Sequence, residues 1–291
     1  MLTIRSHLAV FGLLLAGQGT DPVLPLPGRT SVEIVARGLD NPRGLAFGVR
    51  GELYVAEAGR GGPSCGQDAC SGPSGAITVI EFGHQWRVVS GLASGAGMAG
   101  VTGPSDVTIG ADGEPVHTST AGPGLYRGAN LLTAIPAPVA AVDSVIVDAR
   151  ERALLRIGPR GRLRTIATFP GPGTPSSVTA GPDGAWFVGE MFDPAAVRPP
   201  AARIWRVEPG RAPAVWATGF SGVIDLAWGP GNRLYVLERG ALTSVDGKGE
   251  RRVVATTGLS SPGGLAIRGG HAYVSTCSTC QDTGAVLKIR L

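Results

Sequence analysis

The chain has 291 residues, of which 46 are glycine and 23 are proline, and it carries a net charge of +4 with only 16% charged residues. So many glycines and prolines exclude long helices, coiled coils and helical bundles, because both residues destabilise a helix interior. With 43% hydrophobic residues the chain also differs from disordered proteins, so the composition predicts short apolar strands joined by many tight turns.

The N-terminus predicts a signal peptide. Arg5 and His7 precede an apolar run, Leu8–Ala16, which is too short to span a bilayer but suits the core of a signal peptide. We therefore expect residues 1–20 to direct export, with a disordered extension as the alternative. Residues 21–30 form a proline-rich lead-in, and residues 31–291 are expected to form one folded domain outside the cell or at the cell envelope.

Hairpin-like segments recur along this domain. Each has an apolar strand, a tight turn containing glycine and a second apolar strand, which is the chemistry of a β-hairpin. The copies are residues 44–57, 106–119, 177–190, 225–238 and 264–276, with a reduced copy at Val145–Asp148. Two further strand-like pieces follow most hairpins, and four strands at a period of about 44 residues are typical of propeller blades. The sequence thus predicts an all-β fold, a six-bladed β-propeller with four-stranded antiparallel blades.

The last repeat stops after its third strand. Val32–Ala36 resembles the fourth strands of other repeats, Trp86–Ser90 and Arg251–Ala255, and like them precedes a Gly-Leu pair. We therefore expect this N-terminal strand to complete the C-terminal blade and to close the ring, which would also cover exposed sheet edges.

Four cysteines fall in two close pairs, Cys65 with Cys70 and Cys277 with Cys280. In an exported protein these predict disulfides, and the two local pairings are the simplest. The alternative is a zinc site to which each pair contributes two thiolates.

The basic residues are almost all arginines, and the densest group lies between Arg150 and Arg164. In Arg162–Ile166 the charges alternate with apolar residues, as on the exposed face of a strand. We interpret this group as a solvated surface rather than a polyanion site, and expect no nucleic-acid partner.

Five motifs occur in order along the domain: Arg37–Gly48, Leu53–Gly62, Thr102–Asp106, Ile224–Trp228 and Cys277–Cys280. Together they resemble the ScyD/ScyE family of secreted bacterial proteins. The resemblance implies an exported six-bladed propeller whose biochemical activity is largely undefined. Between Gly122 and Asp148 the chain is shorter than the family pattern, so blades two and three are expected to be less regular.

The first strand of each blade lines the channel of a propeller, so the residues entering these strands are expected to converge near its axis. They are Arg43, Asp106, Ser177, Asp225 and Gly264. Asp106 and Asp225 are the best ligand-binding candidates, because each interrupts an otherwise apolar strand. The alternative is a structural pairing of a channel aspartate with Arg43.

Acidic residues recur where the second strands end, at Glu57, Asp148, Glu190 and Glu238. Carboxylates gathered at one channel mouth would suit Ca²⁺, which makes Ca²⁺ the candidate cofactor and Glu57, Glu190 and Glu238 its candidate ligands. The alternative is that each carboxylate accepts backbone N–H groups at its own strand end.

Two functions are compatible with this pattern. The leading hypothesis is a monomeric binding or scaffold protein, without a transmembrane segment, that takes a small molecule or an extracellular protein at one channel mouth. The cysteine-bearing loops Gly59–Gly75 and Thr276–Gly284 would flank that mouth on one face.

The alternative is a metal- or quinone-dependent enzyme. Gly38–Phe47 also resembles, more faintly, propeller sugar dehydrogenases that use pyrroloquinoline quinone, and gluconolactonase-type hydrolases carry a metal in the channel. Such enzymes need a catalytic histidine or a complete acidic cage, for which the chain offers only His117 and the pair Asp106 and Asp225. His117 lies inside a second strand, where a packed and hydrogen-bonded histidine is expected, and no Ser-His-Asp triad can be assembled.

Overall fold

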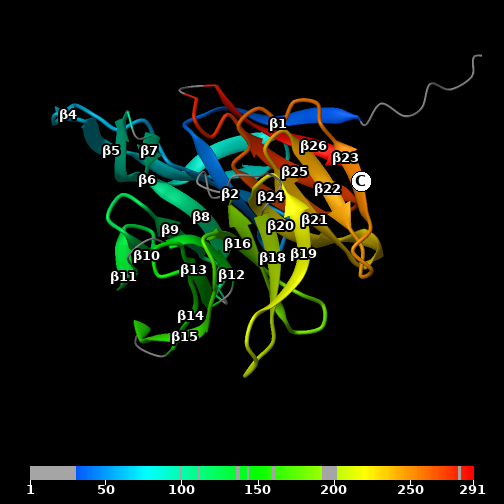
Figure 1. The fold of residues 1–291 in the computed structure, drawn as a ribbon. Coiled ribbons are helices and arrows are strands. Elements are labelled where there is room, and N and C mark those ends of the chain that lie inside the picture. Colours follow the sequence, from blue (N-terminus) through cyan, green and yellow to red (C-terminus); the bar gives the residue numbers. More distant parts are fainter. Residues whose placement is uncertain are drawn as a thin grey trace, which may run out of the picture.

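The computed structural model describes residues 31–98, 100–110, 112–135, 138–142, 144–158, 161–191, 202–280 and 283–291. Its strands form six antiparallel sheets around a common axis (Figure 1). The predicted six-bladed β-propeller is therefore confirmed. The predicted signal peptide and lead-in, residues 1–30, lie outside the described residues. In the described part of the chain, no helix is long and apolar enough to cross a membrane.

Every blade is built on four strands, which follow one another from the axis outward. In that order the strands are β2 (Pro42–Phe47), β3 (Leu53–Glu57), β5 (Ala69–Glu81) and β6 (His84–Gly97) in blade 1; β8 (Pro104–Ile109), β9 (Pro115–Ser119), β10 (Gly124–Arg127) and β11 (Asn130–Ala134) in blade 2; β12 (Pro138–Val142), β13 (Val145–Asp148), β14 (Ala153–Ile157) and β15 (Leu163–Thr168) in blade 3; β16 (Thr174–Ala180), β17 (Trp186–Met191), β18 (Ala202–Val207) and β19 (Ala214–Phe220) in blade 4; β20 (Val223–Gly229), β21 (Arg233–Glu238), β22 (Ala241–Val245) and β23 (Arg251–Ala255) in blade 5; and β24 (Gly264–Arg268), β25 (His271–Thr276), β26 (Gly284–Arg290) and β1 (Val32–Leu39) in blade 6.

The ring closes as the sequence predicts. Strand β1 pairs antiparallel with β26, from Val32 opposite Ile289 to Leu39 opposite Gly284. Ala36 and Leu39 are buried in the core between blades 6 and 1. The two ends of the folded domain therefore share one sheet.

Six hydrophobic clusters hold the blades together, one between each pair of neighbours. The second strands explain this, because both of their faces are covered. In β3, Leu53 and Val55 pack toward blade 6, whereas Tyr54 and Ala56 pack toward blade 2. A strand buried on both faces is a continuous apolar run, which is the pattern that marks the repeats.

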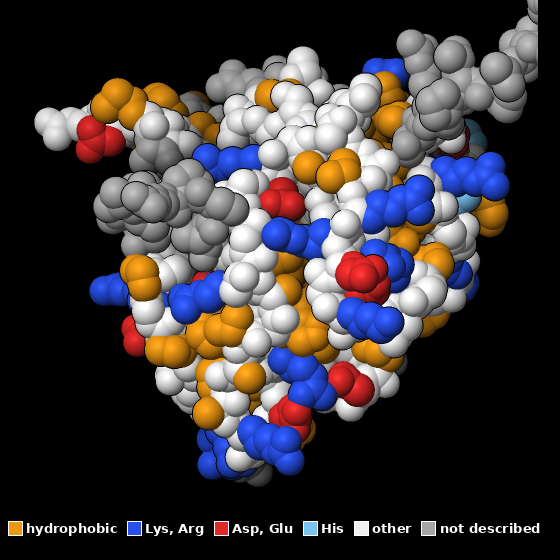
Figure 2. Space-filling model, turned by 45° about the vertical axis from the view of Figure 1, so that its right-hand side comes forward, with side chains coloured by type: hydrophobic (Ala, Val, Ile, Leu, Met, Phe, Trp, Pro, Cys, Tyr) orange, Lys and Arg blue, Asp and Glu red, His pale blue; other side chains and the backbone are white. Residues whose placement is uncertain are grey.

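Blade 1 departs from a uniform four-stranded propeller, and this departure matters for function. Blades 2 and 3, which were expected to be less regular, each keep four strands. In blade 1, β5 and β6 continue beyond the blade and pair with the short strands β4 (Ser64–Cys65) and β7 (Gly100–Thr102). We call this extension the arm; it projects from the ring at the upper left of Figure 1. Elsewhere the surface is mixed, and basic, acidic and apolar side chains alternate over the face in Figure 2.

Candidate functional site

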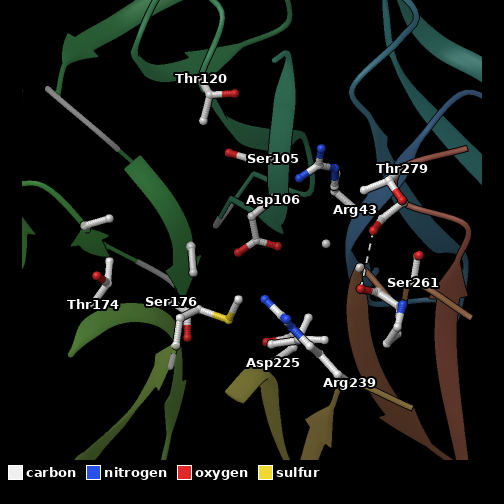
Figure 3. Close-up of a pocket in the computed structure, with 18 of the residues that line it drawn as sticks. Arg43, Ser105, Asp106, Thr120, Thr174, Ser176, Asp225, Arg239, Ser261 and Thr279 are labelled. Carbon is white, nitrogen blue, oxygen red and sulfur yellow. Dashed lines mark hydrogen bonds between the residues drawn. The ribbon is translucent and has the colours of Figure 1, made fainter. Parts of the chain in front are cut away.

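A pocket of about 630 Å³ opens at the end of the channel where the inner strands begin. All six blades contribute to its wall, either with the first residues of an inner strand or with the loop that follows a second strand. Its charged lining residues are Arg43, Asp106, Asp225 and Arg239, and Figure 3 shows these side chains pointing toward one another. Of the five residues expected to converge near the axis, the structure therefore brings Arg43, Asp106 and Asp225 together in the pocket wall, whereas Ser177 and Gly264 do not line it.

Asp106 and Asp225 begin the inner strands of blades 2 and 5. Because two blades lie between blades 2 and 5 on either side of the ring of six, the carboxyl groups face each other across the axis (Figure 3). Oδ1 of Asp106 accepts the N–H of Val107 at 2.9 Å, and Oδ2 accepts the N–H of Ala141, in blade 3, at 2.8 Å. Each oxygen thus has a backbone donor, and one of them links two blades.

Asp225 repeats this arrangement on the opposite side. Its Oδ1 accepts the N–H of Leu226 at 2.8 Å, and its Oδ2 accepts the N–H of Leu265, in blade 6, at 2.7 Å. Both channel aspartates therefore join their blade to the next one while their carboxyl groups line the pocket.

The pair is electrostatically unusual. Burial raises the pKa of Asp106 well above its ordinary value, and the charge of Asp225 raises it further. Burial also raises the pKa of Asp225, to about 7, although two backbone N–H groups oppose the change. A carboxyl pair of this kind retains a proton near neutral pH.

Arg43 lies beside the pair on blade 1. One terminal nitrogen donates to the carbonyl of Val101, in the arm, at 3.1 Å. Its Nε is buried and has no partner among the described residues, and burial lowers the pKa of the guanidinium. The predicted structural pairing of Arg43 with a channel aspartate is absent from the described residues, so no ion pair there neutralises this half-buried cation.

Ser177 is the predicted site residue that the structure moves out of the pocket. A bulge in the pairing of β16 with β17 separates Pro175 from Ser177, and the wall residue is Ser176. Ser177 is fully buried, and its Oγ lies so close to Gly189 that a Cβ there would approach to 2.6 Å. A two-atom side chain held against β17 does not reach the channel.

The predicted Ca²⁺ ligands are engaged within their own blades instead of converging. Glu57 is fully buried and accepts hydrogen bonds from Thr78, from Arg87 and from the N–H of Asp40. Glu190 accepts two hydrogen bonds from Arg203, at 2.8 and 3.2 Å.

Glu238 is held in the same manner. One oxygen accepts the N–H and the hydroxyl of Ser221, and the other accepts the hydroxyl of Thr243. None of the three glutamates lines the pocket. No group of three His, Cys, Asp or Glu side chains able to hold a metal occurs in the ranges that the structure describes, so these residues do not fit a Ca²⁺ site. The recurrence at strand ends reflects repeated local hydrogen bonding.

The cysteines form the two local disulfides, Cys65–Cys70 and Cys277–Cys280. This confirms the simplest predicted pairing and replaces the alternative of a zinc site. The second disulfide closes a loop whose Ser278 and Thr279 line the pocket. The first staples the tip of the arm, and the arm contacts the pocket through the bond of Arg43 to Val101.

Two further residues, His117 and Arg239, differ in whether they reach the pocket. His117 is buried and stacks on Tyr126, with ring centroids 5.5 Å apart, and burial lowers its pKa to about 4. It does not line the pocket. Arg239 does, and sequence reasoning missed it; the available signal was its position directly after Glu238, where the second strand of blade 5 ends.

No protein-family model matches the chain, and no curated protein matches it. Several solved structures share the fold. A catalytically inactive variant of virginiamycin B lyase from Staphylococcus aureus, solved with quinupristin, is 12% identical with a TM-score of 0.56, covering 90% of this chain and 100% of that one. A provisionally named oxidoreductase (glucose dehydrogenase) from Thermus thermophilus is 17% identical with a TM-score of 0.56 and the same coverage. A provisionally named gluconolactonase is 13% identical with a TM-score of 0.51, covering 91% and 93%. At these identities the likeness is one of fold.

Proposed function

We propose that this chain is an exported binding protein of the ScyD/ScyE type, which takes a small polar molecule at the pocket of the channel mouth. The observation that carries the proposal is the guanidinium of Arg43, half-buried in the pocket wall and without an acidic partner among the described residues, beside two facing carboxyl groups. Buried charges in proteins are normally paired, and a ligand would supply the missing partner.

The size and wall of the pocket support the same function. Its volume of about 630 Å³ lies within the range of small-molecule sites, roughly 300–1,000 Å³. Apart from the charged groups the wall carries small hydroxyl side chains such as Ser261 and Thr279 and the apolar Met191. A few placed polar groups in a concave wall are typical of ligand pockets.

The two disulfides support export of the protein. Both disulfides are local and compatible with an extracellular protein, in agreement with the signal peptide expected from residues 1–20. A loop closed by a disulfide loses little entropy when it orders around a ligand, and the Cys277–Cys280 loop forms part of the wall.

The test is capture of small molecules by the purified protein. Culture medium of the producing organism is passed over the protein, and compounds released on denaturation are identified by mass spectrometry. Thr279→Trp fills the mouth, whereas Val253→Trp adds the same side chain on the exposed outer strand of blade 5. We expect compounds that the wild type and the Val253 variant retain and the Thr279 variant loses. Equal retention by all three would contradict the proposal.

Catalysis at the same mouth is the second candidate. The facing carboxyls favour it, because the raised pKa of Asp225, about 7, lets one group give or take a proton near neutral pH. The structural neighbours named for lyase, oxidoreductase and lactonase activities agree with this candidate in fold alone. Melting of the purified protein with and without Ca²⁺ or pyrroloquinoline quinone tests the metal- and quinone-dependent versions, which require a clear rise in melting temperature.

A further inference from the structure

The charged groups of the pocket define which ligands it favours. Among the residues that line it, only Arg43, Arg239, Asp106 and Asp225 are charged. They come from blades 1, 5 and 2, and all four face the same space (Figure 3). Two guanidinium groups therefore oppose one carboxyl pair.

The two carboxyl groups do not neutralise the two guanidinium groups. All four carboxyl oxygens of Asp106 and Asp225 accept backbone N–H groups. Arg43 in turn is held by a carbonyl, the oxygen of Val101, and not by a carboxylate. Since burial and mutual repulsion keep a proton on the pair near neutral pH, the wall carries a net positive charge there.

We propose that the pocket selects small hydroxylated molecules that carry one carboxylate, and that Arg43 binds this carboxylate. The inference rests on the proposed binding function and names its ligand class. A planar guanidinium matches a carboxylate in geometry and forms charge-assisted hydrogen bonds with it. A protonated carboxyl of the pair donates a further hydrogen bond to the same anion.

The rest of the wall suits the remainder of such a ligand. The hydroxyls of Ser261, Thr174 and Thr279 lie around the charged groups (Figure 3) and can exchange hydrogen bonds with ligand hydroxyl groups. No lysine lines the pocket, so the net positive charge of its wall compensates about one negative charge on a ligand. A monocarboxylate therefore fits the charge of the wall better than a dianionic phosphate does.

Matched acids and amides test this inference. Glucuronate is compared with glucuronamide, and lactate with lactamide, by ligand-observed NMR titration at about pH 6.5, below the pKa of Asp225. We expect each acid to bind at least about tenfold more tightly than its amide, a difference of about 1.4 kcal/mol. Arg43→Gln should abolish the preference, whereas Arg252→Gln, which removes the same charge from the exposed outer strand of blade 5, should keep it.

A measurement on the unchanged protein makes the test independent of whether the Arg43 variant folds. Raising the pH through about 7 ionises the carboxyl pair, so binding of the acids should weaken while binding of the amides stays constant.

The outcomes separate the two proposals. If the amides bind as tightly as the acids and Thr279→Trp displaces both, the mouth is a ligand site but selection by charge is wrong. If the acids bind and keep their preference in the Arg43 variant, Arg43 is not the anchor and the inference also fails. If neither class binds, the inference is overturned, and capture from culture medium then decides the binding function by itself.

Discussion

Replacing Asp225 by asparagine tests whether the folded protein holds a proton on its channel carboxyls. Folding raises the pKa of Asp225 from 3.8 to about 7 through burial. Between these values the folded protein binds a proton that the unfolded chain has released. A group of this kind stabilises the fold fully below its unfolded pKa, and the contribution disappears as the pH rises through the folded pKa. We therefore expect wild-type stability to fall from about pH 4 to about pH 7.

The magnitude follows from the same interval. One pH unit corresponds to about 1.4 kcal/mol for a single proton, so the carboxyl of Asp225 removes roughly 4 kcal/mol of stability by about pH 8. Asparagine cannot ionise and escapes this loss. It has one acceptor oxygen, however, where Asp225 accepts the N–H groups of both Leu226 and Leu265. Leaving one buried donor unpaired costs about 1–3 kcal/mol at every pH.

The stability curves of the wild type and of the Asp225→Asn variant should therefore cross as the pH rises. At about pH 4 the Asp225→Asn variant should be less stable than the wild type, and at about pH 9 it should be the more stable of the two. Urea unfolding at constant ionic strength across this range measures both curves. Asp246→Asn is the control, since Asp246 also accepts two backbone N–H groups, both on Oδ1, but is only half-buried and has a lowered pKa. A pH-independent cost at Asp225, or one that grows with pH, would refute the reasoning.

Three further changes probe the fold. A chain starting at Asp40 lacks β1 and should lose cooperative thermal unfolding, whereas a chain starting at Ser31 should keep it, because β1 completes blade 6; calorimetry distinguishes them. Glu190→Ala should cost about 1–3 kcal/mol in urea unfolding, because the half-buried guanidinium of Arg203 loses its buried carboxylate partner, against less than about 1 kcal/mol for the more exposed ion pair broken by Asp183→Ala. Gly44→Ala should lower the melting temperature by several degrees in a thermal-shift assay, because its Cβ would meet the channel aspartate of blade 2.

The architecture was accessible from the sequence because it depends on repeated local patterns. Second strands such as β3 and β21 are buried on both faces, so Leu53–Ala56 and Leu234–Leu237 are continuous apolar runs with glycine-containing turns before them, although β9 is equally buried and carries polar side chains at 117–119. The closing strand was identified for the same reason, since Val32–Ala36 carries the pattern of a fourth strand. The hydrophobic pattern of a strand reflects which of its faces are buried, and this burial recurs from blade to blade in a propeller.

The site was accessible only where a residue breaks that repeat. Asp106 and Asp225 are charges in otherwise apolar strands, and both line the pocket. Ser177 was placed by alignment alone, and a bulge that the sequence does not mark puts Ser176 in the wall instead. Arg239 and Thr279 lie in loops after second strands, where length and composition differ between blades. The assembled ring brings these residues into the pocket wall, so their placement cannot be predicted from any single repeat.

The pocket also depends on the closure of that ring. The carbonyl of Arg43, in blade 1, accepts the hydroxyl of Ser275, in blade 6, at 2.7 Å. Gly264 approaches the same carbonyl so closely that a Cβ there would lie 2.6 Å from it. Blade 6 is complete only when β1 has paired with β26. Because the backbone of Arg43 is held across this seam, and its guanidinium by the arm, the cation at the mouth reaches its position only after the two ends of the domain have met. Formation of the binding site and closure of the propeller should therefore be one cooperative event.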